Sequence, residues 1–394
     1  MYAEVKKKQN QHILILEGYC KQCLPFIRGF KELGCEVSVL CGSRWDCGYS
    51  SKLPDHKILG VCDLYRPDES ENYIVNLIKN GEYDVVLPMF DMSARILSKH
   101  YGELKEFASI CVMTYDRYII SSDKLEVMQI CERYGIPHPI TVLKNKYANL
   151  KEEGLRFPVI IKPRNLYGAR GFRVFQNEKQ LNNFFESRKI QSVDYVIQEQ
   201  ILPGSALVTC VMYIDRYGNV KSCYVYQSEH FYPIEGGTST LNGIIERPDI
   251  IENCKRLVQS LKLRGLVGVD LMIDIRDNIG KVIEINARCV HGITLGFISG
   301  VNHAQQILED VNGQKVTEMN PIRKDLCCRI LQTDVLWWLK SPERFQRTPK
   351  KLGYRYVKEQ MFYWDDPLPW FTFLLGGIKD YRKKMKEKRG IYGQ

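Results

Sequence analysis

The chain has 394 residues, enough for two or three domains, and its composition of 44% apolar and 26% charged residues is that of a folded globular protein. The net charge is +10, but residues 321–394 hold 17 Lys and Arg against 8 Asp and Glu, a net charge of +9, so the rest is nearly neutral. This excludes a nucleic-acid-binding function argued from charge over the whole chain. There is no secretory signal, the 14 Cys are mostly scattered, and the single CxxC has no second pair, so we expect a cytoplasmic protein with reduced thiols and no zinc site.

The first third of the chain predicts a parallel α/β domain over residues 1–115. Short apolar strands at 12–18, 35–42, 83–89 and 109–114 alternate with amphipathic helices. The loop after the first strand lacks a GxGxxG pattern, so no dinucleotide-binding fingerprint is present there.

A helix follows, with Ser122 or Asp123 as its cap and Lys124 in its first turn. The strand 157–163 then ends near Lys162, whose charge must reach solvent or meet an anion. For Lys124 the plain alternative is an exposed surface lysine.

Next comes a glycine-bearing hairpin, in which Gly168 and Gly171 flank Ala169 and Arg170. Backbone amides in such a flap can lie over phosphates, although glycine hairpins are also common without that role. The segment is not a P-loop, because it lacks the GK[ST] ending and a following helix.

The strand at 195–199 ends in Gln198 and Glu199, where a carboxylate can accept from an adenine amino group or a ribose hydroxyl; the alternative is a rim carboxylate. Residues 230–244 are expected to form a loop rich in Gly, Ser and Thr. Its members Gly237, Thr238, Ser239 and Thr240 offer amides and hydroxyls to an anionic substrate, or else are merely solvated.

Residues 266–292 predict an antiparallel hairpin with its turn at Asn278 and Gly280. Asp270 on the first strand comes opposite Glu284 and Asn286 on the second, which share one face. Three oxygen donors suit Mg²⁺, and Arg288 on the same face suits a phosphate. The plain alternative is the wet face of a sheet.

These motifs, in this order, resemble the ATP-grasp superfamily, and most of all its carboxylate–amine ligase branch with a carbamoyl-phosphate synthase and biotin carboxylase type of core, over about residues 12–312. The resemblance implies an N-terminal parallel α/β pre-ATP-grasp domain (1–115), a linker helix and lid subdomain (116–195), an antiparallel-sheet catalytic subdomain (196–318) and a helical, aromatic-basic extension (319–394). The class is therefore α/β and α+β.

The resemblance also implies the ligands: ATP and Mg²⁺, with Mn²⁺ as an alternative metal. Lys124 and Lys162 would contact the phosphates, Gly168, Ala169, Arg170 and Gly171 would close over them, and Gln198, Glu199, Gln200, Ile201 and Leu202 would hold the adenosine. Asp270, Glu284 and Asn286 would bind the metal. Many relatives carry a Glu after the Pro-Gly, where this chain has Ser205 and Ala206, so nucleotide affinity is in question.

The activity so implied is a ligase that activates a substrate carboxylate as an acyl phosphate and joins it to an amine or thiol, in cell-surface polysaccharide or natural-product synthesis. Arg288 and Lys162 would be catalytic. Gly237, Thr238, Ser239, Thr240, Arg288 and His291 would line the substrate site, although His291 could be a bystander. The alternative is a membrane-associated ATP-binding module whose activity is lost, or altered to phosphorylation or carboxylation.

The last 74 residues join four Trp to a basic cluster. The apolar run 370–378 is too short to cross a bilayer. Four interpretations stay open for the tail: a helical cap on the catalytic domain, a peripheral anchor at the inner face of the membrane, a homodimer surface, or a docking site for a partner helix. The expected partners are small-molecule carboxylate and amine substrates, and no nucleic acid.

Overall fold

The computed structural model describes residues 10–143, 150, 152, 154–164, 172–187, 195–234, 237–346 and 356–375. The expected glycine flap, Gly168 to Gly171, lies outside these residues. Within them the chain forms three sheets, of five, four and seven strands. No helix in this described part is long and apolar enough to cross a membrane.

The N-terminal domain is built on a five-stranded parallel sheet of order β3-β2-β1-β4-β5. Its strands are β1 (His12–Ile15), β2 (Glu36–Cys41), β3 (His56–Leu59), β4 (Val85–Leu87) and β5 (Ser109–Ile110). Its helices are α1 (Cys23–Glu32), α2 (Cys47–Ser50), α3 (Pro67–Asn80), α4 (Asp91–Lys99) and α5 (Tyr101–Leu104). The central strands β1, β2 and β4 are apolar and almost entirely buried, as parallel sheets require, whereas the edge strand β3 is mostly exposed.

Two helices lead to the small sheet: α6 (Tyr115–Ser122) and α7 (Lys124–Arg133). Asp123 is the N-cap of α7, and its carboxylate accepts from the backbone N–H groups of Leu125 and Glu126 at 3.0 and 3.3 Å. Arg164 donates to the same carboxylate at 2.7 Å, so the start of α7 is tied to the residue that follows strand β7 (Val159–Pro163).

The lid sheet has the order β6-β9-β7-β8 and is antiparallel. It consists of β6 (Thr141–Leu143), β7 (Val159–Pro163), β8 (Arg173–Phe175) and β9 (Tyr195–Glu199), with α8 (Glu178–Ser187) beside it. A separate apolar core holds it together, which makes it a distinct structural unit.

The catalytic sheet has the order β14-β13-β10-β11-β12-β15-β16. Its strands are β10 (Ala206–Ile214), β11 (Val220–Tyr232), β12 (Thr238–Ile245), β13 (Gly265–Ile273), β14 (Gly280–Asn286), β15 (Cys327–Arg329) and β16 (Val357–Glu359), and its helices are α9 (Pro248–Ser260), α10 (Ile293–Ile298) and α11 (His303–Val311). All neighbours are antiparallel except β15 and β16. Residues 230–244 are therefore mostly strand, and the expectation of a loop there is wrong: β11 continues to Tyr232, and β12 begins at Thr238.

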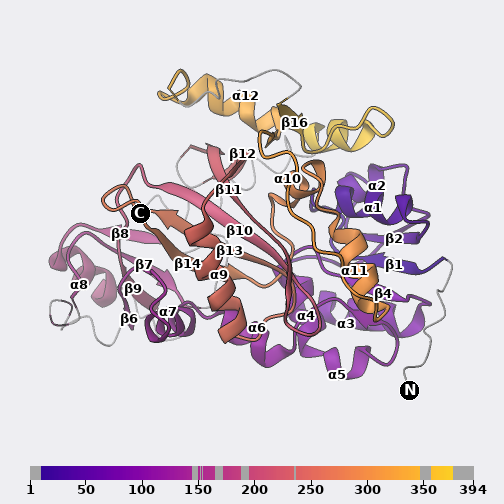
Figure 1. Cartoon of the computed structure of the whole chain (residues 1–394), viewed down its shortest axis with the longest axis horizontal. Helices are drawn as coiled ribbons and strands as arrows, with labels where there is room; N and C mark the ends of the chain where they lie inside the picture. The colour runs from indigo at the N-terminus through magenta and orange to yellow at the C-terminus, as the bar shows by residue number, and fades with distance from the viewer. Residues whose placement is uncertain are drawn as a thin grey trace.

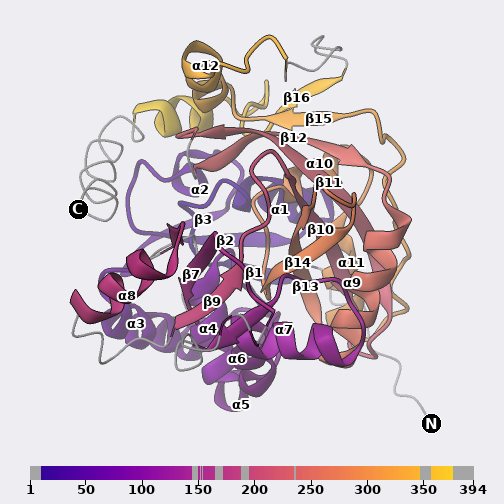
Figure 2. The ribbon, with the colours of Figure 1, turned by 90° about the vertical axis from the view of Figure 1, so that its left-hand side faces the viewer.

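The C-terminal tail, residues 321–394, contacts both the seven-stranded sheet and the N-terminal domain through its described residues. Strands β15 and β16 extend the catalytic sheet, and α12 (Leu331–Lys340) packs against β11 and β12. Arg28 of α1 forms an ion pair with Asp365 at 2.8 Å. In Figure 1 the tail, in yellow, lies across the top of the molecule, and Figure 2 shows β12, β15 and β16 in succession beneath α12.

Candidate functional site

The hairpin of β13 and β14 carries the acidic groups. Its register pairs Asp270 with Glu284 and Gly268 with Asn286, with a bulge between Asp270 and Leu271. The two carboxylates therefore lie directly across the ladder from one another, where cross-strand side chains are close. The local alternation of apolar and polar residues was enough to predict this arrangement.

Asp270 is the centre of a hydrogen-bonded chain. Its Oδ1 accepts from Thr209 Oγ1 at 2.6 Å, and its Oδ2 accepts from Asn286 Nδ2 at 2.9 Å. Asn286 Oδ1 in turn accepts from Arg288 at 2.9 Å. Burial and the nearby charge of Glu284 raise the pKa of Asp270 to about 7.

This donor set fits a divalent cation. Two carboxylates that face one another in a half-buried place repel, and a cation between them removes that cost. Carboxylate and carboxamide oxygens are the ligand types that Mg²⁺ prefers. Asp270, Glu284 and Asn286 are therefore the described residues that could hold the metal.

Two lysines face the hairpin from the lid side. Lys124, at the start of α7, is buried, and its Nζ lies 4.0 Å from Glu284 Oε2. Lys162, near the end of β7, donates to Gln198 Oε1 at 2.9 Å. Burial lowers the pKa of Lys162 to about 8 against the opposing charge of Glu284, and burial also lowers the pKa of Lys124. Two cations confined beside acidic groups form a site for a polyanion.

Glu199, the last residue of strand β9, is bound by an arginine of the catalytic hairpin. Glu199 Oε1 accepts from Arg276 Nη2 at 2.9 Å, and Arg276 also binds Asp274. The residue after the Pro-Gly turn takes part, since Ser205 Oγ accepts from the N–H of Ile275 at 3.2 Å. The turn of the catalytic hairpin thus supports the segment Gln200 to Leu202, in which Ile201 is buried.

Arg288 is fully enclosed between the domains. It forms an ion pair with Asp91 Oδ2 at 3.0 Å, and its Cζ lies 4.8 Å from the centre of the Phe90 ring. Burial lowers its pKa, but the Asp91 charge more than offsets this, so the pKa of Arg288 is raised and its charge is permanent.

The segment Gly237 to Thr240, expected to bind substrate, has contacts that differ from one residue to the next, and none of the contacts found is with Arg288. Thr238 is exposed, Ser239 Oγ donates to Asn242 Oδ1 at 2.6 Å, and the buried Thr240 donates to Asp334 Oδ1 at 3.0 Å. Gly237 packs so tightly that an added Cβ would lie 2.2 Å from the Pro233 carbonyl oxygen. On these contacts, Ser239 and Thr240 are held within the protein, Thr240 by the tail.

His291 does lie beside Arg288. Burial, Lys21 and Arg288 lower its pKa far below the ordinary value, so the imidazole is neutral at neutral pH. Its Nδ1 is buried and has no hydrogen-bond partner in the described structure.

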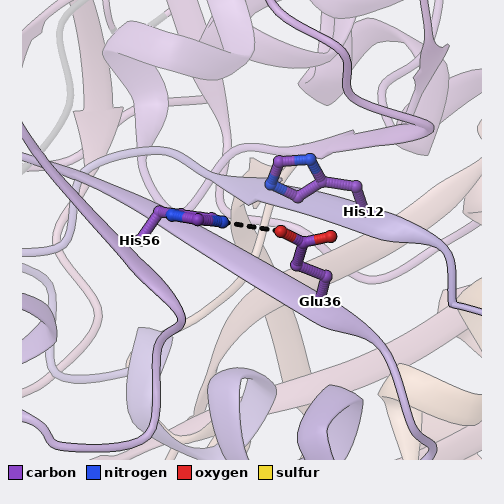
Figure 3. A group of neighbouring side chains, drawn as sticks. All are labelled: His12, Glu36 and His56. Carbon is purple, nitrogen blue, oxygen red and sulfur yellow. Dashed lines mark hydrogen bonds and ion pairs between the residues drawn. The ribbon is translucent and has the colours of Figure 1, made fainter.

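A second group of ligand-type side chains lies on the N-terminal sheet, on β1, β2 and β3 (Figure 3). Glu36 Oε1 lies 2.6 Å from His56 Nε2, while His12 Nε2 lies 2.7 Å from Ser38 Oγ and His12 Nδ1 lies 2.8 Å from the Glu82 carbonyl oxygen. Both nitrogens of His12 are thus engaged, and a metal ion would have to displace Ser38. His12, Glu36 and His56 are the first residues of their strands. The β1–α1 loop and α4, which face the β13–β14 hairpin, instead follow the last residues of β1 and β4, so the group lies at the opposite edge of the sheet.

Sequence reasoning missed Asp91, Thr209, Arg276 and the tail residue Asp334. Asp91 was recognised as a helix start, and Arg276 only as part of a polar turn. Each of these residues contacts a partner at least 61 positions away in the sequence: Thr209 and Asp270 are 61 positions apart, and Arg276 and Glu199 are 77. No local sequence pattern carries that information.

Comparison with known proteins agrees with this geometry. Residues 121–291 match the ATP-grasp domain family. The carbamoyl phosphate synthase large chain of Clostridium beijerinckii is 22% identical over 81% of this chain and 30% of its own length, and the D-aspartate ligase of Enterococcus faecium is 22% identical over 56% of each. The structure of biotin carboxylase from Campylobacter jejuni, in a β,γ-ATP complex, has a TM-score of 0.65 at 18% identity, covering 77% of this chain and 71% of that one.

The fold is thus the ATP-grasp fold, with an N-terminal five-stranded parallel sheet ahead of two sheets that are mainly antiparallel. Residues 121–291 match the ATP-grasp domain, whose family includes ligases and carboxylases, and this match confirms the resemblance drawn from the motifs. The match spans 30% of the length of the first of these curated relatives and 56% of the length of the second.

Proposed function

We propose that this protein is an ATP- and Mg²⁺-dependent ligase that activates a substrate carboxylate as an acyl phosphate and joins it to an amine or thiol. The observation that carries the proposal is the convergence of Lys124, Lys162 and Glu284 with the Asp270–Asn286–Arg288 chain. Cations and metal ligands in one enclosed place are what phosphoryl transfer requires, since the protein mainly positions the reactants and neutralises charge.

In this proposal Asp270, Glu284 and Asn286 hold the metal, which when bound neutralises phosphate charge. Lys124 and Lys162 bind phosphate oxygens, and Gly168, Ala169, Arg170 and Gly171 cover them. Gln198 to Leu202 hold the adenosine, with Glu199 oriented by Arg276.

Arg288 then orients the substrate carboxylate for attack on the γ-phosphate and stabilises the charge of the acyl phosphate. The P–O bond to ADP breaks as the new P–O bond to the carboxylate forms. Attack by the amine expels phosphate and leaves an amide, and closure over the site keeps water from the intermediate.

The D-aspartate ligase relative supports C–N bond formation, whereas biotin carboxylase and carbamoyl phosphate synthase point to carboxylation or phosphorylation as the alternative. A role in cell-surface polysaccharide or natural-product synthesis stays part of the proposal.

The test is ADP release with Mg-ATP and pools of amino acids, small carboxylates and sugar amines, with a parallel set containing bicarbonate. ADP that requires both a carboxylate and an amine supports the ligase; ADP that requires bicarbonate supports the alternative. Glu284→Ala is expected to abolish the signal, and Glu252→Ala, an exposed acid on α9, is the matched control that keeps it.

A peripheral membrane contact through the tail is a second candidate. The outer face of α12 and the segment after it expose Val335, Leu336, Trp338, Leu339 and Phe345. Exposed apolar and aromatic side chains near Lys340 and Arg344 in the sequence favour binding to anionic lipid. Co-sedimentation with phosphatidylglycerol vesicles tests this candidate function. The intact protein should pellet with the vesicles, and the double variant Trp338→Ser, Phe345→Ser should stay in the supernatant. An intact protein that also stays in the supernatant would contradict the membrane contact.

A further inference from the structure

Lys21, in the loop between β1 and α1, is a buried cation that has no ion-pair partner among the described residues. Its exposed fraction is 7%, and burial lowers the pKa of its amino group to about 8. Among the described residues, no carboxylate lies within ion-pair distance of its Nζ, and no hydrogen bond from that atom is found. A buried ammonium left unpaired costs several kcal/mol, so such a residue is a candidate ligand-binding group.

Other polar groups around Lys21 are also unsatisfied. The His291 ring, with its unpaired Nδ1, is close enough for both Lys21 and Arg288 to lower its pKa. Gln360, directly after β16, is 1% exposed, and neither its oxygen nor its nitrogen makes a hydrogen bond in the described part of the chain. Buried polar atoms are normally paired, and this concentration of exceptions requires an explanation.

The three segments meet in the same apolar core. Cys20, Val290 and Met361, the sequence neighbours of Lys21, His291 and Gln360, belong to one buried cluster, together with Cys328 of β15. The unsatisfied side chains therefore share one region, between the N-terminal domain, the β14–α10 loop and the tail. We name Lys21, His291, Glu359 and Gln360 the tail chamber.

Glu359 supplies the opposite charge. Its side chain is 11% exposed, and its oxygens accept from the N–H of Leu331 at 3.1 and 3.2 Å, while Arg329 Nε lies 3.8 Å away. A carboxylate has room for further donors beyond these. Burial raises the pKa of Glu359 to about 7, and the charge of Lys21 opposes this rise, so the two groups interact electrostatically. The tail chamber thus offers an ammonium group and a carboxylate that influence one another.

We propose that the tail chamber binds a zwitterionic amino acid, with the carboxylate of the amino acid on Lys21 and its ammonium group on Glu359. This rests on the proposed ligase function and names the substrate class of that site. A cation and an anion fixed in a buried place recognise a ligand that carries both charges, and they reject one that leaves either charge unpaired. The tail is then part of the substrate site.

The experiment uses the full chain and thermal unfolding with Mg²⁺ and a non-hydrolysable ATP analogue, followed by separate additions of the common L-amino acids and their D-enantiomers. In the wild type the nucleotide should raise Tm, and at least one amino acid should raise it further. Lys21→Gln should keep the nucleotide effect and lose the amino-acid effect, and its ligand-free Tm should be equal or higher, because a buried charge is gone. Lys21→Arg should restore part of the effect, and Lys52→Gln, an exposed lysine of the same domain, should behave as wild type.

The outcomes separate the two proposals. A wild type whose Tm does not respond to Mg-nucleotide would count against the ligase itself. A response to nucleotide but to no amino acid would overturn the tail chamber alone, as would an amino-acid effect of equal size in Lys21→Gln. In turnover, Lys21→Gln and Glu359→Gln should each raise KM for the amino acid at least tenfold and leave KM for ATP unchanged.

Discussion

The carboxylate of Asp91 lies 3.0 Å from the guanidinium of Arg288, and both side chains are more than nine-tenths buried. Asp91 begins α4 in the N-terminal domain, and Arg288 follows the last strand of the catalytic hairpin. The pair therefore fixes Arg288, the arginine proposed to be catalytic, against a domain that carries none of the proposed metal ligands. A further link continues inward, because the Ser93 hydroxyl donates to Glu17 at the end of β1.

Asp91→Asn should lower kcat by about thirtyfold or more, because the loss of one partner from a buried charge pair costs about 2 kcal/mol or more. KM for ATP should change little, since Arg288 is proposed to contact the carboxylate substrate and not the nucleotide. Steady-state kinetics of ADP formation measure both constants. Asp116→Asn, which removes an exposed partner of Arg117, is the control, and an equal loss in both variants would contradict the assigned role.

Arg276→Ala should raise KM for ATP about two- to fivefold at constant kcat. Arg276 holds Glu199 at 2.9 Å but is 41% exposed, and such pairs contribute up to about 1 kcal/mol. Glu199 would then lose the orientation in which it meets the adenosine. An unchanged or lower KM would mean that the pair instead competes with nucleotide. Arg264→Ala, a surface arginine of the same sheet, serves for comparison.

The free energy of unfolding should fall between about pH 4.5 and pH 7 through Glu17. Burial raises the pKa of Glu17 from 4.5 to about 7, with a smaller contribution from the Asp91 charge. Below pH 4.5 both states are protonated; between the two values the unfolded state has lost its proton while the folded state keeps it, so stability declines as pH rises. The decline is about 3 kcal/mol at most. Urea unfolding at pH 5 and pH 8 should show a smaller difference for Glu17→Gln than for the wild type. The exposed Glu32→Gln should leave the difference unaltered.

Trp337→Ala should destabilise the protein by about 3 kcal/mol or more, as expected for removal of a buried aromatic side chain. Trp337 is 3% exposed and stacks on His230 with ring centres 3.4 Å apart. Trp364→Ala, at 81% exposure, should cost less than about 0.5 kcal/mol. Denaturant unfolding separates the two, and equal effects would show that the stacking does not anchor the tail.

The features that could be predicted well from the sequence are those that depend on residues close together in the chain. The β13–β14 hairpin, the Asp123 cap and the Lys162 strand each depend on a period of two, a cap pattern or a turn within one short segment. Residues 230–244 were assigned wrongly because Gly, Ser and Thr suggested a loop, whereas pairing with β11 and β15 makes Thr238–Ile245 a strand. Tertiary pairing decided that case.

Long-range partners could not be predicted. Asp334 accepts from Thr240, which lies 94 positions earlier, and the charges around Lys21 come from the tail. No spacing rule connects such residues, and only the folded chain brings them together. The glycine flap lies outside the described residues, so its proposed role over the phosphates stays a prediction.

The pairing of β12 with β15, and of β15 with β16, bears on how the protein can be shortened. Leu241, Asn242 and Gly243 of β12 are paired with Cys328 and its neighbours. Without the last strands, β12 would become an open edge whose unpaired N–H and C=O groups invite a second chain. A fragment trimmed to the ATP-grasp match would therefore be prone to self-association, and solubility would depend on residues that lie outside the matched domain.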